Sequence, residues 1–131
     1  MKFEERYQKI LDSIKPTNDE KMYIRLKRLY CLFNRKYFEN SLPSSHHVCI
    51  AIVPRRIING ALGESTGDTN SDFWKICICK ESHEGEMELT LLHEMAHISV
   101  DRKNKRFCAH GPLWQEEMKR LANLGAFNKL W

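Results

Sequence analysis

Residues 89–100 read LTLLHEMAHISV, and this stretch decides how the chain folds. Apolar residues cover most of its helical circumference, which predicts a buried helix from about Glu84 to Val100. His93 and His97 are four residues apart, so one helical turn places both imidazoles on the same face. Two imidazoles in this arrangement can bind one zinc ion at the usual Zn–N distance of ~2.0–2.1 Å.

Glu94 directly follows the first of these histidines and lies on a neighbouring side of the predicted helix. A pair of hydrogen-bonded core histidines is the alternative interpretation. It would leave the Glu94 carboxylate on an apolar, buried helix, which costs free energy unless a cation lies nearby. Beside a metal, Glu94 can hold and deprotonate a water molecule rather than bind the ion itself. The pattern H-E-x-x-H therefore indicates a catalytic zinc site with Glu94 as its general base.

A catalytic zinc site needs a third protein ligand. We favour His110, because it lies directly before a helix that is expected to begin at Gly111-Pro112. Residues 101–109 are long enough to return the chain to the metal. Glu116 and Glu117 of that final helix are the alternatives, since some zinc proteases use a glutamate ligand. Three protein ligands leave the fourth zinc position open, which is typical of catalytic sites.

The hydrophobic pattern over the rest of the chain predicts an α+β fold. The predicted elements are helices over residues 3–14 and 19–38, strands over 47–53, 58–65 and 74–80, the helix over 84–100, and a final helix from 111–112. We expect the three strands to form a small, mostly antiparallel sheet. Cys77 and Cys79 share one face of the last strand, and ordinary packing is the favoured interpretation of that pair.

The chain has 131 residues, of which 42% are hydrophobic and 29% are charged. This length suits one domain, and because no repeats or long linkers interrupt it, we expect a single domain over residues 1–131. Residues 1–6 lack the apolar stretch of a signal peptide, and no apolar run approaches the ~20 residues that cross a bilayer. We therefore expect a cytoplasmic protein with no membrane partner. Its five cysteines contain no C-x-x-C pair and fit reduced thiols.

The net charge of +4 permits an acidic partner without requiring one. Two groups of basic residues stand out: Lys21, Arg25, Arg28 and Arg35 on the long helix, and Arg102, Lys103, Lys105 and Arg106 after the zinc motif. A solvated surface is the favoured interpretation of both groups. Binding to the phosphate backbone of a nucleic acid is the alternative.

The zinc motif and the segment after it resemble the SprT-like (Spartan-type) zinc metalloprotease domain. His93-Glu94-x-x-His97 followed by His110-Gly111-x-x-Trp114 is similar to that family's HExxH and HGxxF, with Trp114 in place of the usual phenylalanine. Residues 29–43 resemble the family's helix-to-strand connection, and residues 61–63 resemble the start of its second strand. The resemblance covers a core of about residues 20–125.

This resemblance implies a zincin-like fold in which His93, His97 and His110 bind zinc and Glu94 is the general base. It also implies hydrolysis of peptide bonds in protein substrates that are often attached to DNA or work near it, as in the repair of DNA–protein crosslinks. In such folds an edge strand usually holds the substrate as an added β-strand.

Two questions stay open at the level of the sequence. A second group that stabilises the oxyanion is usual in such sites, and His83, Tyr37 and Tyr30 are the candidates. The competing functions are a zinc-stabilised DNA-binding or regulatory module without general protease activity and a zinc hydrolase of non-peptide amides on the same scaffold. Glu94 favours the enzymes, because a structural zinc site has no use for a base beside the metal.

Overall fold

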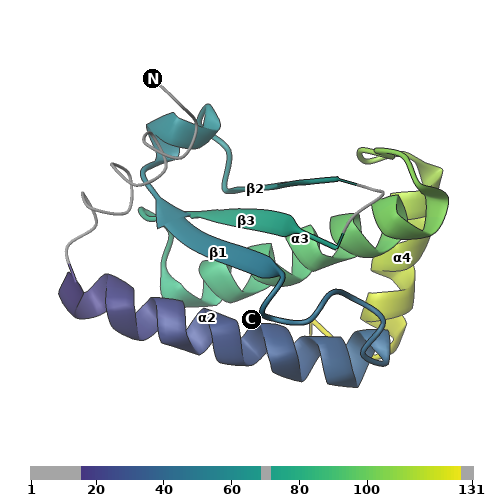
Figure 1. The fold of residues 1–131 in the computed structure, drawn as a ribbon, viewed down its shortest axis with the longest axis horizontal. Helices are drawn as coiled ribbons and strands as arrows, with labels where there is room; N and C mark the ends of the chain where they lie inside the picture. The colour runs from purple at the N-terminus through teal and green to yellow at the C-terminus, as the bar shows by residue number, and fades with distance from the viewer. Residues whose placement is uncertain (1–15, 69–71, 128–131) are drawn as a thin grey trace.

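Three α-helices and a three-stranded sheet make up residues 16–68 and 72–127, the part of the chain that the computed structural model describes (Figure 1). The elements are α2 (Pro16–Phe38), β1 (Val48–Val53), the 3-10 helix η1 (Arg55–Ile58), β2 (Gly63–Gly67), β3 (Trp74–Cys79), α3 (Glu84–Asn104) and α4 (Pro112–Asn123). The α+β class is thus confirmed. The helix predicted over residues 3–14 lies outside the described residues. No described helix has the length and apolar character needed to cross a membrane.

The sheet has the strand order β1-β3-β2 and is mixed. β3 pairs antiparallel with β2 and parallel with β1. The expectation of a mostly antiparallel sheet is therefore wrong for the β1–β3 pair. A short connection joins β2 to β3, which suits antiparallel neighbours, whereas the longer crossover through η1 and β2 allows β3 to return beside β1 in the same direction.

The main core lies between the sheet and the helices. α2 packs against β1, and α3 packs against β2 and β3, while α4 crosses the later part of α3 (Figure 1). The most deeply buried side chains of this core come from α2, β3, α3 and α4: Leu26, Tyr30, Ile76, Ile78, Leu91, Leu92, Met95, Ile98 and Leu121. Burial on nearly all sides of α3 agrees with the apolar circumference that its sequence shows.

A smaller apolar cluster contains both buried cysteines of β3. Cys77 and Cys79 pack there with Ala51, Val53 and Ile58, so the two thiols share one face of the sheet as predicted. Both are free cysteines. Burial raises the pKa of the Cys77 thiol to about 11, which keeps it in the unreactive protonated form at neutral pH.

A buried polar network fastens α4 to the other two helices. Ser99 of α3 donates a hydrogen bond to Oε2 of Glu117 at 2.6 Å, and Arg120 donates to the same carboxylate. Arg120 also donates to the backbone carbonyl of Tyr37 in α2 at 2.8 Å. Burial acts to raise the pKa of Glu117, but the bonds from Arg120 and Ser99 outweigh it and hold the pKa below its ordinary value. The carboxylate is therefore ionised at neutral pH and fixes the position of α4.

β2 passes very close to α3 at Gly63. A Cβ atom at this glycine would overlap Cγ2 of Thr90 and would lie 3.2 Å from Oε1 of Glu94. The missing side chain is thus what lets the strand lie directly on the helix beside the predicted general base.

Replacing Gly63 with alanine should lower the free energy of unfolding by about 1–3 kcal/mol, the usual cost of overpacking an interior contact. Denaturant unfolding measures this change. Thr90→Ser removes Cγ2 and keeps the hydroxyl, so its addition to Gly63→Ala should recover part of the loss. Equal losses in the single and double variants would show that Thr90 does not limit the approach of β2.

The Glu117 network should make stability depend on pH. A folded-state pKa below the ordinary value of 4.5 stabilises the fold above that pH, and this contribution is lost as the pH falls through the folded-state pKa. We expect Glu117→Gln to lose about 1–3 kcal/mol of unfolding free energy at neutral pH, and the loss to shrink in acid. Denaturant unfolding across this pH range measures both, with the exposed neighbour substitution Glu116→Gln as the matched control. A loss that stays constant down to pH ~3 would contradict the assignment.

Candidate metal centre

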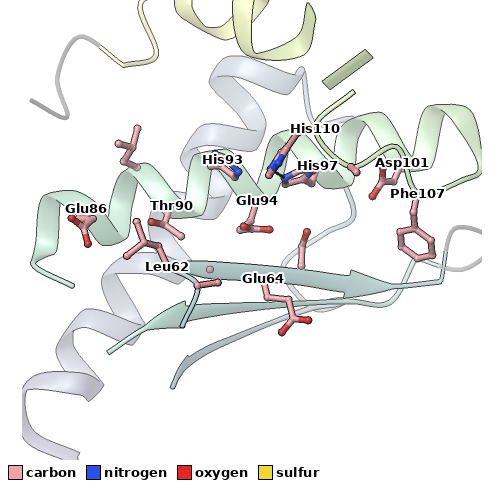
Figure 2. A pocket seen from close by; sticks show the side chains of 15 residues that line it. Leu62, Glu64, Glu86, Thr90, His93, Glu94, His97, Asp101, Phe107 and His110 are labelled. Atoms are coloured by element: carbon pink, nitrogen blue, oxygen red, sulfur yellow. Dashed lines mark hydrogen bonds between the residues drawn. The ribbon is translucent and has the colours of Figure 1, made fainter. Parts of the chain in front are cut away.

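The side chains of His93, His97 and His110 come together beside α3 (Figure 2). Each offers one ring nitrogen, and these three atoms lie within 4.8 Å of one another. The Nε2 atoms of His97 and His110 are 3.1 Å apart. Small ring rotations would let the three imidazoles converge on one cation at the ~2.0–2.1 Å of a Zn–N bond. Among residues 16–68 and 72–127, no other group of histidine, cysteine and acidic side chains has metal-binding geometry.

The loop after α3 returns His110 to the two helical histidines. α3 ends at Asn104, four residues later than predicted, and Lys105 closes it in the left-handed conformation. Asp101 then accepts a hydrogen bond from the backbone N–H of Cys108 at 2.9 Å, which ties the loop back to the helix. Gln115 donates to the carbonyl of His110 at 3.0 Å. These contacts set the position of His110 before α4 begins.

The two glutamates that were alternative third ligands lie elsewhere. Glu117 is buried in the network with Ser99 and Arg120, and Glu116 is exposed on α4. Neither belongs to the histidine group. The structure therefore brings His110 to the two helical histidines and leaves both glutamates apart.

Burial shifts both helical histidines towards their neutral form. It lowers the pKa of His93, and it lowers the pKa of His97 to about 4, with a further contribution from the nearby histidines. Protonated rings this close together would repel one another. At neutral pH the His93 and His97 rings are therefore uncharged, which is the form that can bind a metal ion.

Glu94 points from α3 towards β2 in the same cleft (Figure 2). The residue is only 5% exposed, and burial raises the pKa of its carboxyl to about 7. A hydrogen bond with Ser65 of β2 opposes this rise, while the charges of Glu64 and Asp101 add to it. A cation at the three histidines would favour the ionised carboxylate. A carboxyl that titrates near neutral pH can both accept and return a proton.

An open cleft of about 570 Å³ lies between α3 and β2 and contains Glu94 and the three histidines. Leu62, Leu89 and Phe107 give it apolar walls, and Glu64 and Glu86 add acidic groups. Phe107 is 63% exposed. The described residues that line the cleft include no lysine or arginine, so the basic side chains of residues 20–68 and 72–127 lie outside it.

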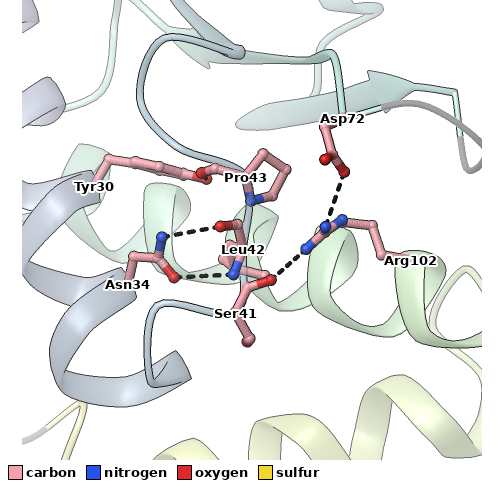
Figure 3. Close-up of polar contacts among 7 residues, drawn as sticks. All are labelled: Tyr30, Asn34, Ser41, Leu42, Pro43, Asp72 and Arg102. Atoms are coloured by element: carbon pink, nitrogen blue, oxygen red, sulfur yellow. Dashed lines mark hydrogen bonds and ion pairs between the residues drawn. The ribbon is translucent and has the colours of Figure 1, made fainter.

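Arg102 is a structural residue rather than part of a solvated basic loop (Figure 3). It lies within α3, donates to the backbone carbonyl of Ser41, and forms an ion pair with Asp72 at 2.9 Å. It thereby joins α3 to the connection before β1 and to the connection before β3. Its predicted companions Lys103 and Lys105 are exposed.

The connection between α2 and β1 is held by buried side chains of α2 (Figure 3). The amide of Asn34 bonds the backbone of Leu42 in both directions, at 3.1 and 3.2 Å. The hydroxyl of Tyr30 donates to the carbonyl of Pro43 at 2.5 Å. The residues that resembled a family connection in the sequence thus hold this turn in place.

None of the three candidates for a second oxyanion-stabilising group lines the cleft. Tyr30 is engaged with Pro43, and Tyr37 is buried in the core. His83 caps the start of α3 by accepting from the backbone N–H of Glu86 at 3.2 Å. Sequence reasoning missed Ser65, which contacts Glu94. Its only signal is the period-two spacing that places Ser65 on the same side of β2 as Gly63.

A family model described as the SprT-like family matches residues 26–129, which is most of the chain. No curated protein matches the sequence.

Substitution of His110 should show whether the third metal ligand is this histidine or a glutamate of α4. We expect His110→Ala to weaken Zn²⁺ binding by more than about 100-fold, since groups that merely support zinc ligands are already worth 10–100-fold. Glu117→Gln should bind Zn²⁺ within a few-fold of the unchanged protein, because it removes no ring nitrogen. Competition titration against a chromophoric chelator measures both. Loss of binding in the glutamate variant alone would assign the third ligand to α4 instead.

Proposed function

The chain belongs to the SprT-like family, and from this premise we propose that it is a zinc-dependent metallopeptidase that hydrolyses peptide bonds of protein substrates. The observation that carries the proposal is the convergence of His93, His97 and His110 with Glu94 beside them in an open cleft. A purely structural zinc site would need neither the cleft nor a buried carboxylate next to its ligands.

The three histidines suit zinc better than a hard cation such as magnesium. Imidazole nitrogen is a common zinc ligand, whereas magnesium and calcium prefer oxygen. Both helical rings are neutral at pH 7 because burial lowers their pKa. His93, His97 and His110 would hold the ion, and zinc bound there would supply Lewis acidity, lowering the pKa of water and polarising a carbonyl group.

Glu94 is the proposed general base. Its carboxylate would accept the proton of the attacking water and then deliver it to the leaving amine of the cleaved peptide. Burial raises the pKa of this carboxyl, and a cation at the histidines would oppose that rise and favour the carboxylate that the first step needs. Ser65 and the close approach of Gly63 hold this side chain between helix and strand.

β2 is the proposed substrate-binding strand. In the sheet of the described residues it pairs with β3 along one edge only, and residues 61–65 line the cleft. An extended peptide could pair with the other edge as an added strand, which recognises the backbone more than the side chains. The apolar walls at Leu62, Leu89 and Phe107 would accept apolar side chains of the substrate.

A nucleic acid is the second partner that we propose. Lys103 in the last turn of α3 and Lys105 and Arg106 directly after the helix are all exposed, and the loop that they begin approaches the cleft at Phe107. Arg25 and Arg102 take part in ion pairs with Glu88 and Asp72 instead. The exposed cations could bind phosphate and bring the cleft to proteins on DNA, as the repair of DNA–protein crosslinks would need. They also support the alternative function, a zinc-stabilised DNA-binding or regulatory module.

Glu94→Gln tests the enzymatic proposal. We expect the zinc-loaded unchanged protein to cleave an unfolded protein substrate, and the variant to cleave it about 10²–10⁴-fold more slowly, the usual contribution of general acid–base catalysis. Gel-based proteolysis measures both rates, after zinc analysis has shown equal metal content. Stimulation by single-stranded DNA that weakens steeply with salt would place the activity on nucleic acid. Salt-dependent DNA binding without cleavage would favour the binding module.

A further inference from the structure

Trp114 contacts all three histidines of the metal centre. Its ring centroid lies 4.9 Å from that of His93, 5.2 Å from that of His97 and 4.6 Å from that of His110. The His97 ring stacks on the indole with an interplanar angle of 18°, and the other two rings are tilted by 56°. One side chain thus packs against three rings that arrive from two different segments of the chain.

Besides Trp114, the three histidine rings contact one another, with centroids 4.8 to 5.5 Å apart, and a cluster of such rings still needs something outside it to fix their planes. A histidine that binds a metal almost always donates its second ring N–H to a carboxylate or a backbone carbonyl, which fixes the ring. Among the described residues, the ring nitrogens of His93, His97 and His110 make one hydrogen-bond contact, and it joins Nε2 of His97 to Nε2 of His110. No described protein group bonds the Nδ1 atoms. The χ2 torsion of histidine is intrinsically broad, so hydrogen bonds from the described residues leave the ring planes undefined.

We propose that Trp114 is the positioning residue of the metal centre, which holds the planes of the three imidazoles by ring packing. The inference rests on the proposed metal site and does not require peptide hydrolysis. Aromatic contacts restrict ring rotation and add to the free energy of burial. Rings that are already oriented lose less conformational entropy when they bind an ion, so binding is tighter.

Trp114 is itself held firmly. It lies in the first turn of α4, two residues after Pro112 at the start of the helix. The Glu117 network ties this helix to α3 and α2. The indole N–H of Trp114 is buried and has no hydrogen-bond partner among the described residues. The faces of the Trp114 ring, rather than its N–H, therefore make the contacts that orient the histidines. A phenylalanine ring at this position should make the same kind of contact.

The test compares Trp114→Leu and Trp114→Phe with Trp74→Phe as the matched control. Trp74 is more deeply buried than the partly buried Trp114, at 3% exposed, and its indole N–H likewise lacks a partner among the described residues. Its ring contacts Phe107, with centroids 6.5 Å apart, and it has no ring contact with the three histidines. Loss of packing at Trp74 therefore reports general loosening of the fold.

Zn²⁺ affinity by chelator competition and the visible spectrum of the Co²⁺-loaded protein are the two readouts of site geometry. We expect Trp114→Leu to weaken Zn²⁺ binding by about tenfold and to alter the Co²⁺ spectrum. Trp114→Phe and Trp74→Phe should stay within about twofold of the unchanged protein, since both leave an aromatic ring against the histidines. Thermal unfolding of the metal-free variants checks that each one folds.

Tryptophan fluorescence gives an independent signature. Zn²⁺ should change the emission of the unchanged protein and of Trp74→Phe, and the change should disappear in Trp114→Phe although that variant still binds the ion. This comparison tests whether the ion binds against the Trp114 ring, as the inference requires, even if the leucine variant does not fold.

Three outcomes would overturn the inference. The first is unchanged affinity and an unchanged Co²⁺ spectrum in folded Trp114→Leu. The second is an equal loss of affinity in Trp74→Phe, which would mean that general loosening is the cause. The third is an emission change in Trp114→Phe as large as in the unchanged protein. Failure of the unchanged protein to bind Zn²⁺ would remove the proposed metal site together with this inference, whereas metal binding without proteolysis would leave the inference standing.

Discussion

The burial of α3 is the constraint on which the rest of the structure depends. This helix packs against β2 and β3, α2 and α4, so almost every other element is placed by contact with it. Its apolar residues form the core. Its buried polar residues therefore need hydrogen-bond partners at their own positions. Ser99 meets the Glu117 carboxylate, and Asp101 meets the loop backbone at Cys108. Glu94 has β2 beside it, close enough that position 63 has no room for a side chain.

α4 completes the site, because the position of this helix determines where His110 and Trp114 lie. The carboxylate of Glu117 and the guanidinium of Arg120 join α4 to α3 and α2, and loss of Arg120 would leave the buried Glu117 carboxylate without its charge partner. The helix therefore has little freedom to move relative to α3. His110 and Trp114 both depend on that fixed position, because one lies just before the helix and the other in its first turn. A network whose residues do not line the cleft thus helps to hold α4 beside it.

Local spacing in the sequence predicts part of this arrangement. The rest depends on contacts between residues far apart in the sequence, which no local pattern reveals. The four-residue interval between His93 and His97 and the apolar circumference around them are enough to predict α3, and the start of α4 placed His110 in the right region. The parallel pairing of β1 with β3 depends on the path of a crossover, which no local pattern encodes. The contact of Gly63 with α3, the bond from Ser65 to Glu94 and the roles of Arg102 and Glu117 join residues far apart in sequence. Exposed and buried charges also look alike in a sequence, which is why Arg102 was grouped with its solvated neighbours.

The same burial acts in opposite directions on the two kinds of titratable group in the cleft. It lowers the pKa of His93 and His97 and raises the pKa of Glu94, because a charged form of either kind is poorly solvated there. Without a metal the site is therefore pushed towards neutrality, with uncharged rings at His93 and His97 and a Glu94 carboxyl that is partly protonated at neutral pH. A divalent cation between the histidines would reverse the cost for Glu94, since its charge would favour the carboxylate while the neutral rings bind it. Burial alone disfavours the ionised form of Glu94. That ionised form, beside neutral histidines, is nevertheless the one that suits a metal centre with a base next to it.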